Sequence, residues 1–332
     1  MHRTNNPFPD HVVIYASNGS QGAIFSAQAM LNQPAGAYQL TLHGRNEKSH
    51  EGYCRVRCGA RAVHLDEKPG VRRRHGRLDL DGGRTLVIDP GTVTALPESI
   101  ARTPPGCHVA YSQNGIPSHI REKSERMLCS HTLVSKISSS RQCGAGITVE
   151  PGGVLLIDEK DVYLDVFHRI FQNQGFFQLQ AVTDIRAAQY EKIAINCALN
   201  VSATVHGLSL GELQARATGD RAVRNELEGL ALEACRVSAA QGIRLAPQDD
   251  VIAAMYALMA SSPRHRTSMQ QAFEAGVPTE IDVLNGAIAR LGRAWGVPTP
   301  LNRKMVARLA SMEAQRDRQG RFSPGRAEYR AA

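Results

Sequence analysis

Three polar side chains recur at a spacing of four residues within an otherwise apolar stretch: Lys192, Asn196 and Asn200. Residues four positions apart lie on one face of an α-helix, so this spacing predicts a single polar stripe. The residues between them are mostly apolar, which predicts a helix that is buried on most sides. Because a buried ammonium and buried amides are costly without partners, the stripe indicates either an internal hydrogen-bond network or a site that faces a polar ligand.

The chemistry that suits this stripe is the reduction of a carbonyl group. As an ammonium, Lys192 can polarise a ketone oxygen and donate a proton to it while hydride arrives at the carbon. The two asparagines can hold hydroxyl and carbonyl groups of a substrate. An anionic compound with a ketone group is therefore the kind of substrate that this chemistry suits if the stripe faces a ligand.

Glu280 is a candidate partner for this lysine. The sequence predicts a helix that begins at Glu280, with Thr279 as its N-cap, so that the helix dipole would hold the carboxylate ionised. In that position the carboxylate could bind a substrate hydroxyl or orient Lys192. The alternative is an acidic residue that only stabilises the start of its helix.

A second set of candidates follows the first predicted strand, Val12–Tyr15. The turn after it has the spacing G-x-G-x-x-G, with Ser17 in the first place and glycines in the other two, and a predicted helix, Ala23–Leu31, follows. Such a turn lets the backbone approach a pyrophosphate, and the helix N-terminus supplies N–H groups and positive dipole. The alternative is an ordinary strand–turn–helix. The predicted cofactor-binding residues in this turn are Ser17, Asn18, Gly19, Ser20, Gln21 and Gly22.

The end of the next predicted strand, Tyr38–Leu42, bears on the choice of dinucleotide. NAD-binding proteins place an acid there for the ribose hydroxyls, whereas an arginine accommodates the 2′-phosphate of NADP. Arg45 follows this strand with Lys48 close by, and no acid stands at the strand end. The sequence therefore predicts NADP as the cofactor, unless Arg45 is an ordinary loop residue.

Length and composition are those of a folded protein with one large or two ordinary domains. The chain has 332 residues, of which 42% are hydrophobic and 21% charged, and no long low-complexity tract occurs. No apolar run approaches the roughly 20 residues that span a bilayer. The N-terminus lacks the apolar segment of a signal peptide, so we expect a cytoplasmic protein with no membrane partner.

Basic residues outnumber acidic ones, and the formal net charge is +8. An arginine-rich cluster, Val71–Arg77, would suit a phosphorylated cofactor or a nucleic acid. The favoured interpretation is a solvated surface loop, because no nucleic-acid-binding motif accompanies it. We therefore predict no nucleic-acid partner.

The seven cysteines are odd in number and no signal peptide is recognised, which favours reduced thiols. Two of them, Cys54 and Cys58, have His50 and His64 nearby. Their spacing matches no strong zinc pattern, so no metal site is predicted.

The elements that must position these residues change in character near residue 184. Before it, short apolar runs alternate with helical stretches, which predicts an α/β domain with a mostly parallel sheet. The predicted strands are Val12–Tyr15, Tyr38–Leu42, Thr85–Ile88, His108–Tyr111, Thr132–Ile137 and Val154–Ile157.

From residue 184 onward the sequence predicts helices only. Gly242 and Gly296 are expected to end two of them, and the polar, basic residues 317–332 are expected to form a loose tail. The predicted helices cover Asp184–Val201 and Asp220–Ala240, and three more begin at Pro247, Glu280 and near Leu301.

Several of these segments resemble ketopantoate reductases (2-dehydropantoate 2-reductases). Asp184–Asn200 resembles the start of that family's C-terminal domain, and Pro278–Ala287 followed by Gly296–Asn302 resembles a later part of it. Gln113-Asn114-Gly115 matches the Q-N-G that follows the family's fourth strand. The resemblance runs over most of the chain, is strong from about residue 184 to 310 and is weak before residue 105.

The resemblance implies a Rossmann-type NADP-binding domain at residues 1–183 and an all-α catalytic domain at 184–316. It implies the NADPH-dependent reduction of a 2-keto acid to a 2-hydroxy acid, in the pantothenate route for the members that give the family its name. By match, Lys192 would be the general acid and Asn114 would lie between nicotinamide and substrate. The remaining substrate-binding residues implied by the family are Glu280, Asn196, Asn200 and Ser268.

Two departures from the family keep other interpretations open. Ser17 replaces the first glycine of the turn, and Thr92 stands where the family carries a lysine after its third major strand. The favoured hypothesis is reduction of ketopantoate itself. The alternatives are a diverged reductase of another keto acid in secondary metabolism, and a nucleotide-binding relative that has lost catalysis. A homodimer is kept as an alternative to a monomer.

Overall fold

The chain consists of two compact units, the first formed by residues 1–113 and 117–185 and the second by 114–116 and 186–332. A short segment in the middle of the sequence, Asn114–Ile116, thus belongs with the C-terminal residues. The computed structural model describes residues 9–15, 20–32, 38–44, 55–65, 71–75, 85–90, 107–112, 114–116, 129–137, 139–142, 146–171 and 175–318.

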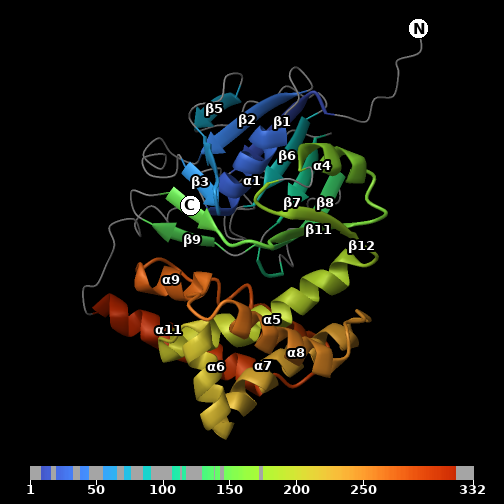
Figure 1. Ribbon diagram of the computed structural model, residues 1–332. Coiled ribbons are helices and arrows are strands. Elements are labelled where there is room, and N and C mark those ends of the chain that lie inside the picture. The colour runs from blue at the N-terminus through green and yellow to red at the C-terminus, as the bar shows by residue number, and fades with distance from the viewer. Residues whose placement is uncertain are drawn as a thin grey trace. The chain divides into compact units, whose positions relative to one another are not determined.

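The first unit is built on an eight-stranded sheet with the order β12-β11-β8-β7-β6-β1-β2-β5 (Figure 1). The strands from β5 to β8 are all parallel, β11 runs antiparallel to β8, and β12 runs parallel to β11. In chain order the six parallel strands lie 3-2-1-4-5-6, the order of doubly wound dinucleotide-binding domains. The predicted α/β fold is therefore confirmed. The strands are β1 (His11–Tyr15), β2 (Gln39–Gly44), β5 (Val71–His75), β6 (Thr85–Asp89), β7 (His108–Tyr111), β8 (Cys129–Lys136), β11 (Val154–Asp158) and β12 (Gln178–Val182).

A second, four-stranded sheet with the order β4-β3-β10-β9 belongs to the same unit. Helix α1 (Ser20–Asn32) contacts β1 of the large sheet as well as β3, β4 and β10 of the small one. Because α1 is covered on both sides, even its polar Ser26 and Gln28 are buried. The small sheet consists of β3 (Arg55–Cys58), β4 (Arg61–His64), β9 (Ser139–Gln142) and β10 (Gly146–Val149).

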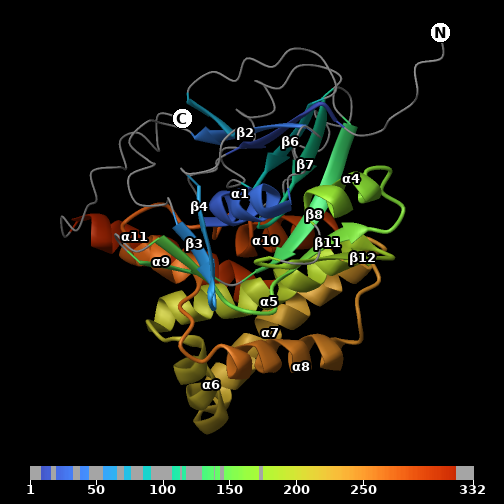
Figure 2. The same ribbon diagram turned by 45° about the horizontal axis from the view of Figure 1, so that its top comes forward.

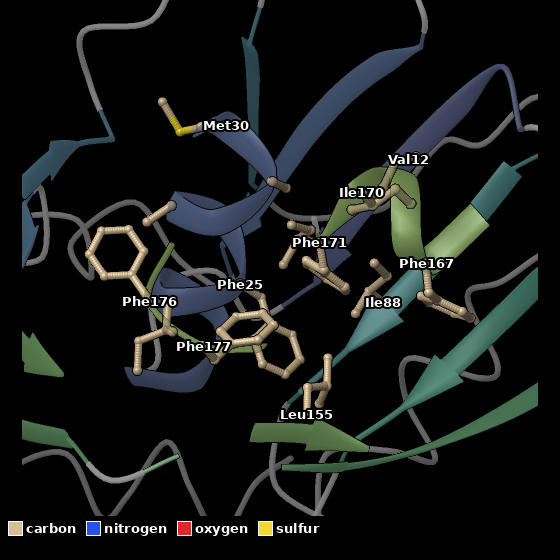
Figure 3. Packing of buried hydrophobic residues seen from close by; sticks show 14 of the residues in the cluster. Val12, Phe25, Met30, Ile88, Leu155, Phe167, Ile170, Phe171, Phe176 and Phe177 are labelled. Atoms are coloured by element: carbon tan, nitrogen blue, oxygen red, sulfur yellow. The ribbon is translucent and has the colours of Figure 1, made fainter. Parts of the chain in front are cut away.

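Aromatic rings join α1 to the segment around helix α4 (Leu164–Ile170) in the core of this unit. The ring of Phe25 lies 5.5 Å from that of Phe171 and 5.4 Å from that of Phe177, measured between centroids (Figure 3). Gln28 adds a polar link, since its Oε1 accepts a hydrogen bond of 2.6 Å from the backbone N–H of Phe176. These contacts hold α1 in one place on the sheet.

Described residues 186–318 of the second unit form helices and connecting turns, as the sequence predicts. Helices α6, α7 and α8 pack on one another (Figure 2). Two short helices, α6 and α9, are not among the predicted ones. The helices are α5 (Ile185–His206), α6 (Leu210–Gly219), α7 (Arg221–Ala240), α8 (Gln248–Ser261), α9 (Ser268–Glu274), α10 (Asn285–Ala294) and α11 (Pro300–Arg318).

The local signals at the ends of several helices explain these bounds. Asp220 caps α7 by accepting a hydrogen bond of 2.8 Å from the N–H of Ala222. Gly242 and Gly296 follow α7 and α10 with φ angles of +74° and +68°, so both predicted helix ends are confirmed. Within the described ranges, no single helix is long and apolar enough to cross a membrane. Helices α5 and α6 taken together would be long and apolar enough among the described residues, but the pair is bent by 90°.

Three expectations from the sequence are wrong in detail. Residues 280–284 form turns, and α10 begins only at Asn285, so Thr279 does not cap it; the Thr279 hydroxyl donates to Glu313 instead. Residues 71–75 of the arginine cluster form strand β5 rather than a loop, because they pair with β2. Helix α11 continues through Arg318, two residues into the expected tail. The rest of that tail lies outside the described residues.

Candidate active site

The polar stripe lies on helix α5 as the spacing predicts. Lys192 and Asn196 are half-buried, and Asn200 is 7% exposed. The apolar residues beside them, among them Ile193 and Cys197, are buried, so α5 is enclosed on most of its surface. The stripe is therefore the polar line of a helix that otherwise packs in the core of its unit.

Lys192 is joined to Glu280 through an asparagine that is distant from both in sequence. The ammonium Nζ of Lys192 donates a hydrogen bond of 2.6 Å to Oδ1 of Asn114. The Nδ2 group of Asn114 in turn donates to Oε2 of Glu280 at 3.3 Å. The cation binds the carbonyl end of the amide and the carboxyl group binds its NH₂ end. Three of the residues singled out from the sequence therefore meet in one hydrogen-bonded chain within the second unit.

Gly115 explains why Asn114 can reach this position. Its φ is +94°, a conformation that side chains disfavour, and a Cβ atom there would lie 2.5 Å from the carbonyl oxygen of Val283. The next residue, Ile116, donates its backbone N–H to that same oxygen at 3.1 Å. Only glycine lets the segment 114–116 approach the turn that carries Glu280 so closely.

The electrostatics of Glu280 differ from the expectation. Glu280 precedes α10 by a turn, so no helix dipole stabilises its charge as the sequence suggested. Desolvation raises the pKa of Glu280, while the hydrogen bond from Asn114 and the charge of Lys192 pull that pKa down in part. Its ionised state depends on these two neighbours rather than on its place in a helix.

The amides of the stripe behave differently from its lysine. Among the described residues, no side-chain hydrogen bond is made by Asn196 or Asn200; only the backbone carbonyl of Asn200 is engaged, by the Thr204 hydroxyl at 2.7 Å. Of the two interpretations of the stripe, an internal network thus fits Lys192, whereas neither amide side chain joins that network among the described residues.

Ser268 stands apart from this chain of residues. It is the exposed first residue of α9, whose N-cap is the neighbouring Thr267. Within the described ranges the structure gives no contact of Ser268 with Lys192, Asn114 or Glu280. The structure therefore does not place Ser268 beside the hydrogen-bonded chain, although the family match suggests a site residue.

The candidate cofactor turn is described only from Ser20 onward, because Ser17, Asn18, Gly19 and Arg45 lie outside the described residues. Helix α1 is the next described element after β1, the strand at which the order of the parallel sheet reverses. Its first turn contains no acidic residue. The free N–H groups of such a helix start fit a phosphate group.

Gln21 and Gly22 have structural contacts within this helix start. The side chain of Gln21 donates to the carbonyl of Ile137 at 3.3 Å and accepts from the hydroxyl of Ser135 at 2.8 Å. The carbonyl of Gly22 accepts a hydrogen bond from Ser26. The Gln21 side chain thus ties the start of α1 to β8 and its end, a role that local sequence did not indicate.

Ser112, at the carboxyl end of β7, is a residue that the sequence reasoning missed. It is 5% exposed, and within the described part of the chain its hydroxyl has no hydrogen-bond partner. Its position directly before Gln113-Asn114-Gly115 is the only sequence signal that could have drawn attention to it.

The remaining departures and alternatives can be placed only in part. Thr92, the counterpart of the family lysine, lies outside the described residues. Cys58 and His64 lie at opposite ends of the β3–β4 hairpin, paired with Arg61 and Arg55. In the described ranges, no three His, Cys, Asp or Glu side chains are grouped to hold a metal ion.

Sequence comparison finds a family match in the C-terminal part of the chain. Residues 184–313 match the family described as ketopantoate reductase PanE/ApbA, C terminal. A 2-dehydropantoate 2-reductase of Caulobacter vibrioides is 32% identical over 134 residues, which cover 40% of this chain and 43% of the relative. The match thus spans less than half the length of that relative.

Structural comparison extends over nearly the whole chain. A PanE/ApbA family ketopantoate reductase from Ralstonia eutropha JMP134 superimposes with a TM-score of 0.75 at 20% identity, covering 92% of this chain and 99% of that one. D-mandelate dehydrogenase, solved with NADH and anilino(oxo)acetate, gives 0.75 at 17% identity, with coverages of 92% and 98%. At such identities these matches establish the fold.

Proposed function

Because the chain resembles ketopantoate reductases in its fold and carries that family's C-terminal domain at residues 184–313, we propose that it is a nicotinamide-dependent keto acid reductase. In its specific form the proposal is NADPH-dependent reduction of a 2-keto acid to a 2-hydroxy acid, with ketopantoate as the favoured substrate. The observation that carries it is the hydrogen-bonded chain Lys192–Asn114–Glu280.

In this proposal Lys192 is the general acid. NADPH, when bound, supplies the hydride that adds to the carbonyl carbon. The Lys192 ammonium polarises the carbonyl oxygen and transfers a proton from Nζ to it, so that the ketone becomes an alcohol and the lysine becomes neutral. The short bond to Asn114 fixes the direction in which Nζ points before substrate arrives.

Asn114 and Glu280 prepare the lysine for this step. The Glu280 carboxylate favours the charged form of Lys192. Asn114 lies between the two side chains, so that the Lys192 proton is not held in a direct ion pair and can be donated to substrate. The amides of Asn196 and Asn200 are proposed to bind the polar groups of the substrate, because neither makes a side-chain hydrogen bond within the described residues. Ser268 is proposed to contact the substrate carboxylate, on the family match alone.

The cofactor is proposed to bind the first unit. The N–H groups at the start of α1, with Ser17 to Gly22, would hold the pyrophosphate, and Arg45 would bind the 2′-phosphate of NADP. The parallel strand order and the position of α1 after β1 support this assignment.

The test is the loss of NADPH absorbance on addition of ketopantoate, with Lys192→Ala as the decisive variant. We expect kcat to fall by about 10²- to 10⁴-fold, because the general acid is lost, while NADPH affinity stays unchanged. Lys192→Arg is the matched control: it keeps the positive charge but is a poor proton donor at neutral pH, so its kcat should also be low. Normal turnover in Lys192→Ala would remove Lys192 from the mechanism.

A second candidate is a reductase of another 2-keto acid. It is favoured by Thr92 in place of the family lysine and by the equal TM-score of D-mandelate dehydrogenase. An aryl 2-keto acid, assayed beside ketopantoate with both NADPH and NADH, discriminates the two. No turnover of any keto acid, with NADPH binding retained, would favour a non-catalytic nucleotide-binding relative.

A further inference from the structure

A second polar network, which is buried, lies in the second unit. Its members are Asn285 and Asn302, both 0% exposed, and Glu233, which is 2% exposed. The Nδ2 group of Asn285 donates to Oδ1 of Asn302 at 2.9 Å, and Nδ2 of Asn302 donates to Oε2 of Glu233 at 2.8 Å. Buried polar groups of this kind are tolerated because they are bonded to one another.

One end of the network has a clear structural purpose. The carboxylate of Glu233 also accepts the backbone N–H groups of Leu301 and Asn302, both at 2.9 Å. These two N–H groups belong to the first turn of α11, which has no partners for them within the helix. Glu233 on α7 therefore anchors the start of α11.

The other end reaches the helix that carries the stripe. The second proton of the Asn285 amide is donated to the backbone carbonyl of Cys197 at 2.8 Å. Cys197 lies on α5 directly after Asn196. Both donors of Asn285 are thus used, one toward α11 and one toward α5.

Asn285 also stands where the Glu280 turn ends, since residues 280–284 are followed directly by α10. The turn is consequently bonded to α5 at both ends. At its start, Glu280 is linked through Asn114 to Lys192; at its end, Asn285 is bonded to Cys197. Helix α5, the side chain of Asn114 and the turn 280–284 are thus joined into a closed ring of hydrogen bonds and backbone, which includes Asn285 and Cys197.

The amide oxygen of Asn285 makes burial of this side chain energetically unfavourable. Oδ1 is buried and has no hydrogen-bond partner among the described residues. An unsatisfied buried acceptor is unfavourable, so an apolar side chain would serve a purely space-filling role better. An apolar side chain could not, however, donate hydrogen bonds to Cys197 and Asn302 as the Asn285 amide does.

We propose that Asn285 is a positioning residue, which holds the turn 280–284 against α5 and thereby sets the geometry of the Lys192–Asn114–Glu280 chain. The expected effect of Asn285 on turnover rests on the proposed function. Its expected effect on the position of the turn 280–284 does not depend on that function.

The first test is kinetic and compares Asn285→Ala with Met255→Ala. Met255 is a fully buried core residue of α8, a helix that is not part of the ring, so its truncation costs stability without removing a hydrogen bond of the ring. In Asn285→Ala we expect kcat to fall by about 10- to 100-fold, with the KM for NADPH unchanged, because a small misplacement of the acid slows the chemical step. Met255→Ala should keep its kcat below its unfolding temperature. Equal kcat losses in both variants would overturn the inference.

The second test needs no substrate and therefore separates this inference from the proposed function. The side-chain amide of Asn114 is followed by ¹⁵N NMR while pH is varied, since its NH₂ group bonds Glu280 and reports that carboxyl group's titration. We expect the pH-dependent shift of this signal to be lost or displaced in Asn285→Ala and retained in Met255→Ala. An unchanged titration in folded Asn285→Ala contradicts a positioning role. Asn285→Ser, which keeps one donor, replaces the alanine variant if that variant does not fold.

Discussion

At the scale of single residues, the separation of Lys192 from Glu280 by an amide has a chemical meaning. A direct ion pair would stabilise the ammonium strongly and compete with substrate for its protons. Through Asn114, the carboxylate acts on the lysine at longer range, and the amide presents only its oxygen to Nζ. The proposed acid is thereby oriented but still able to give up a proton.

The raised pKa of Glu280 leads to a pH prediction. As pH falls through this raised pKa, the carboxylate is protonated and its support for the Lys192 charge is lost, so kcat should fall on the acid side. In Glu280→Gln we expect kcat to be lower by roughly 10-fold or more, because the hydrogen bond from Asn114 then ends on a neutral amide and no longer on a charged carboxylate. The acid limb should also disappear, because glutamine does not titrate. The measurement is the pH profile of kcat. An identical acid limb in both proteins would assign it to another group.

Gly115 offers a prediction with a control of the same backbone conformation. Gly115→Ala combines a positive φ with a clash against the backbone of Val283, whereas Gly207→Ala has a φ of +68° and open space around its Cβ. Strain at such a φ costs about 1–3 kcal/mol, and the clash adds to it only at Gly115. We therefore expect Gly115→Ala to lower the free energy of unfolding more than Gly207→Ala, and to lower kcat as Asn114 is displaced. Equal losses in chemical denaturation would show that the close approach does not matter.

At the scale of elements, a cluster of rings ties two strands of the large sheet to the turn after β11. His108 on β7 and His131 on β8 share a hydrogen bond of 2.9 Å, and His131 binds Asp161 at 2.8 Å. Tyr163 stacks on His108 with 3.9 Å between ring centroids. With one proton between them the two imidazoles are bonded, and a second proton would place two N–H donors face to face.

This cluster predicts a loss of stability in mild acid. The pKa of His108 is lowered by desolvation and by His131, partly offset by Asp161. The unfolded chain, whose histidines titrate near about 6.5, then binds a proton that the folded chain binds less readily, so stability falls as pH drops below that value. His108→Phe keeps a ring for Tyr163 and should flatten the dependence of Tm on pH between about 7 and 5. An unchanged slope in the variant would place the effect elsewhere.

The elements that the sequence predicts best are those buried on both faces. Strand β6 is buried along its whole length, and its centre, Leu86–Ile88, is an uninterrupted apolar run. Strand β5 was missed because its residues are mostly arginines, and pairing with β2 rather than apolar pattern defines it. The start of α10 was misplaced because Thr279 and Glu280 resemble a helix N-terminus, whereas their side chains bond Glu313 and Asn114 instead.

The same limit applies to the candidate site. Spacing alone placed Lys192, Asn196 and Asn200 on one face but did not choose between a network and a ligand surface. The resemblance to a family selected Asn114 and Glu280, and the structure joins both to Lys192. Nothing in the local sequence of Asn285 indicates its bond to Cys197, because that contact spans 88 positions along the chain.

At the scale of the whole molecule, the cofactor should stabilise the fold. A ligand at 100 times its Kd adds about 2.7 kcal/mol to the free energy of unfolding, so NADPH should raise Tm. We expect NADPH to do so at far lower concentration than NADH in the native protein. In Arg45→Ala the advantage of NADPH should shrink by about 10-fold or more, with NADH binding unchanged, because the proposed contact with the 2′-phosphate would be removed. Equal protection by both cofactors in the native protein would remove the preference for NADP.

The segment Asn114–Ile116 makes the second unit discontinuous in sequence. A fragment or chimera cut at residue 184 would carry Lys192 and Glu280 without the amide that joins them. Exchanging C-terminal halves between this chain and a protein of similar fold would likewise pair the lysine of one protein with the asparagine of the other. A cut near residue 184 therefore does not keep the hydrogen-bonded chain together. An exchange of the second unit has to transfer residues 114–116 as well.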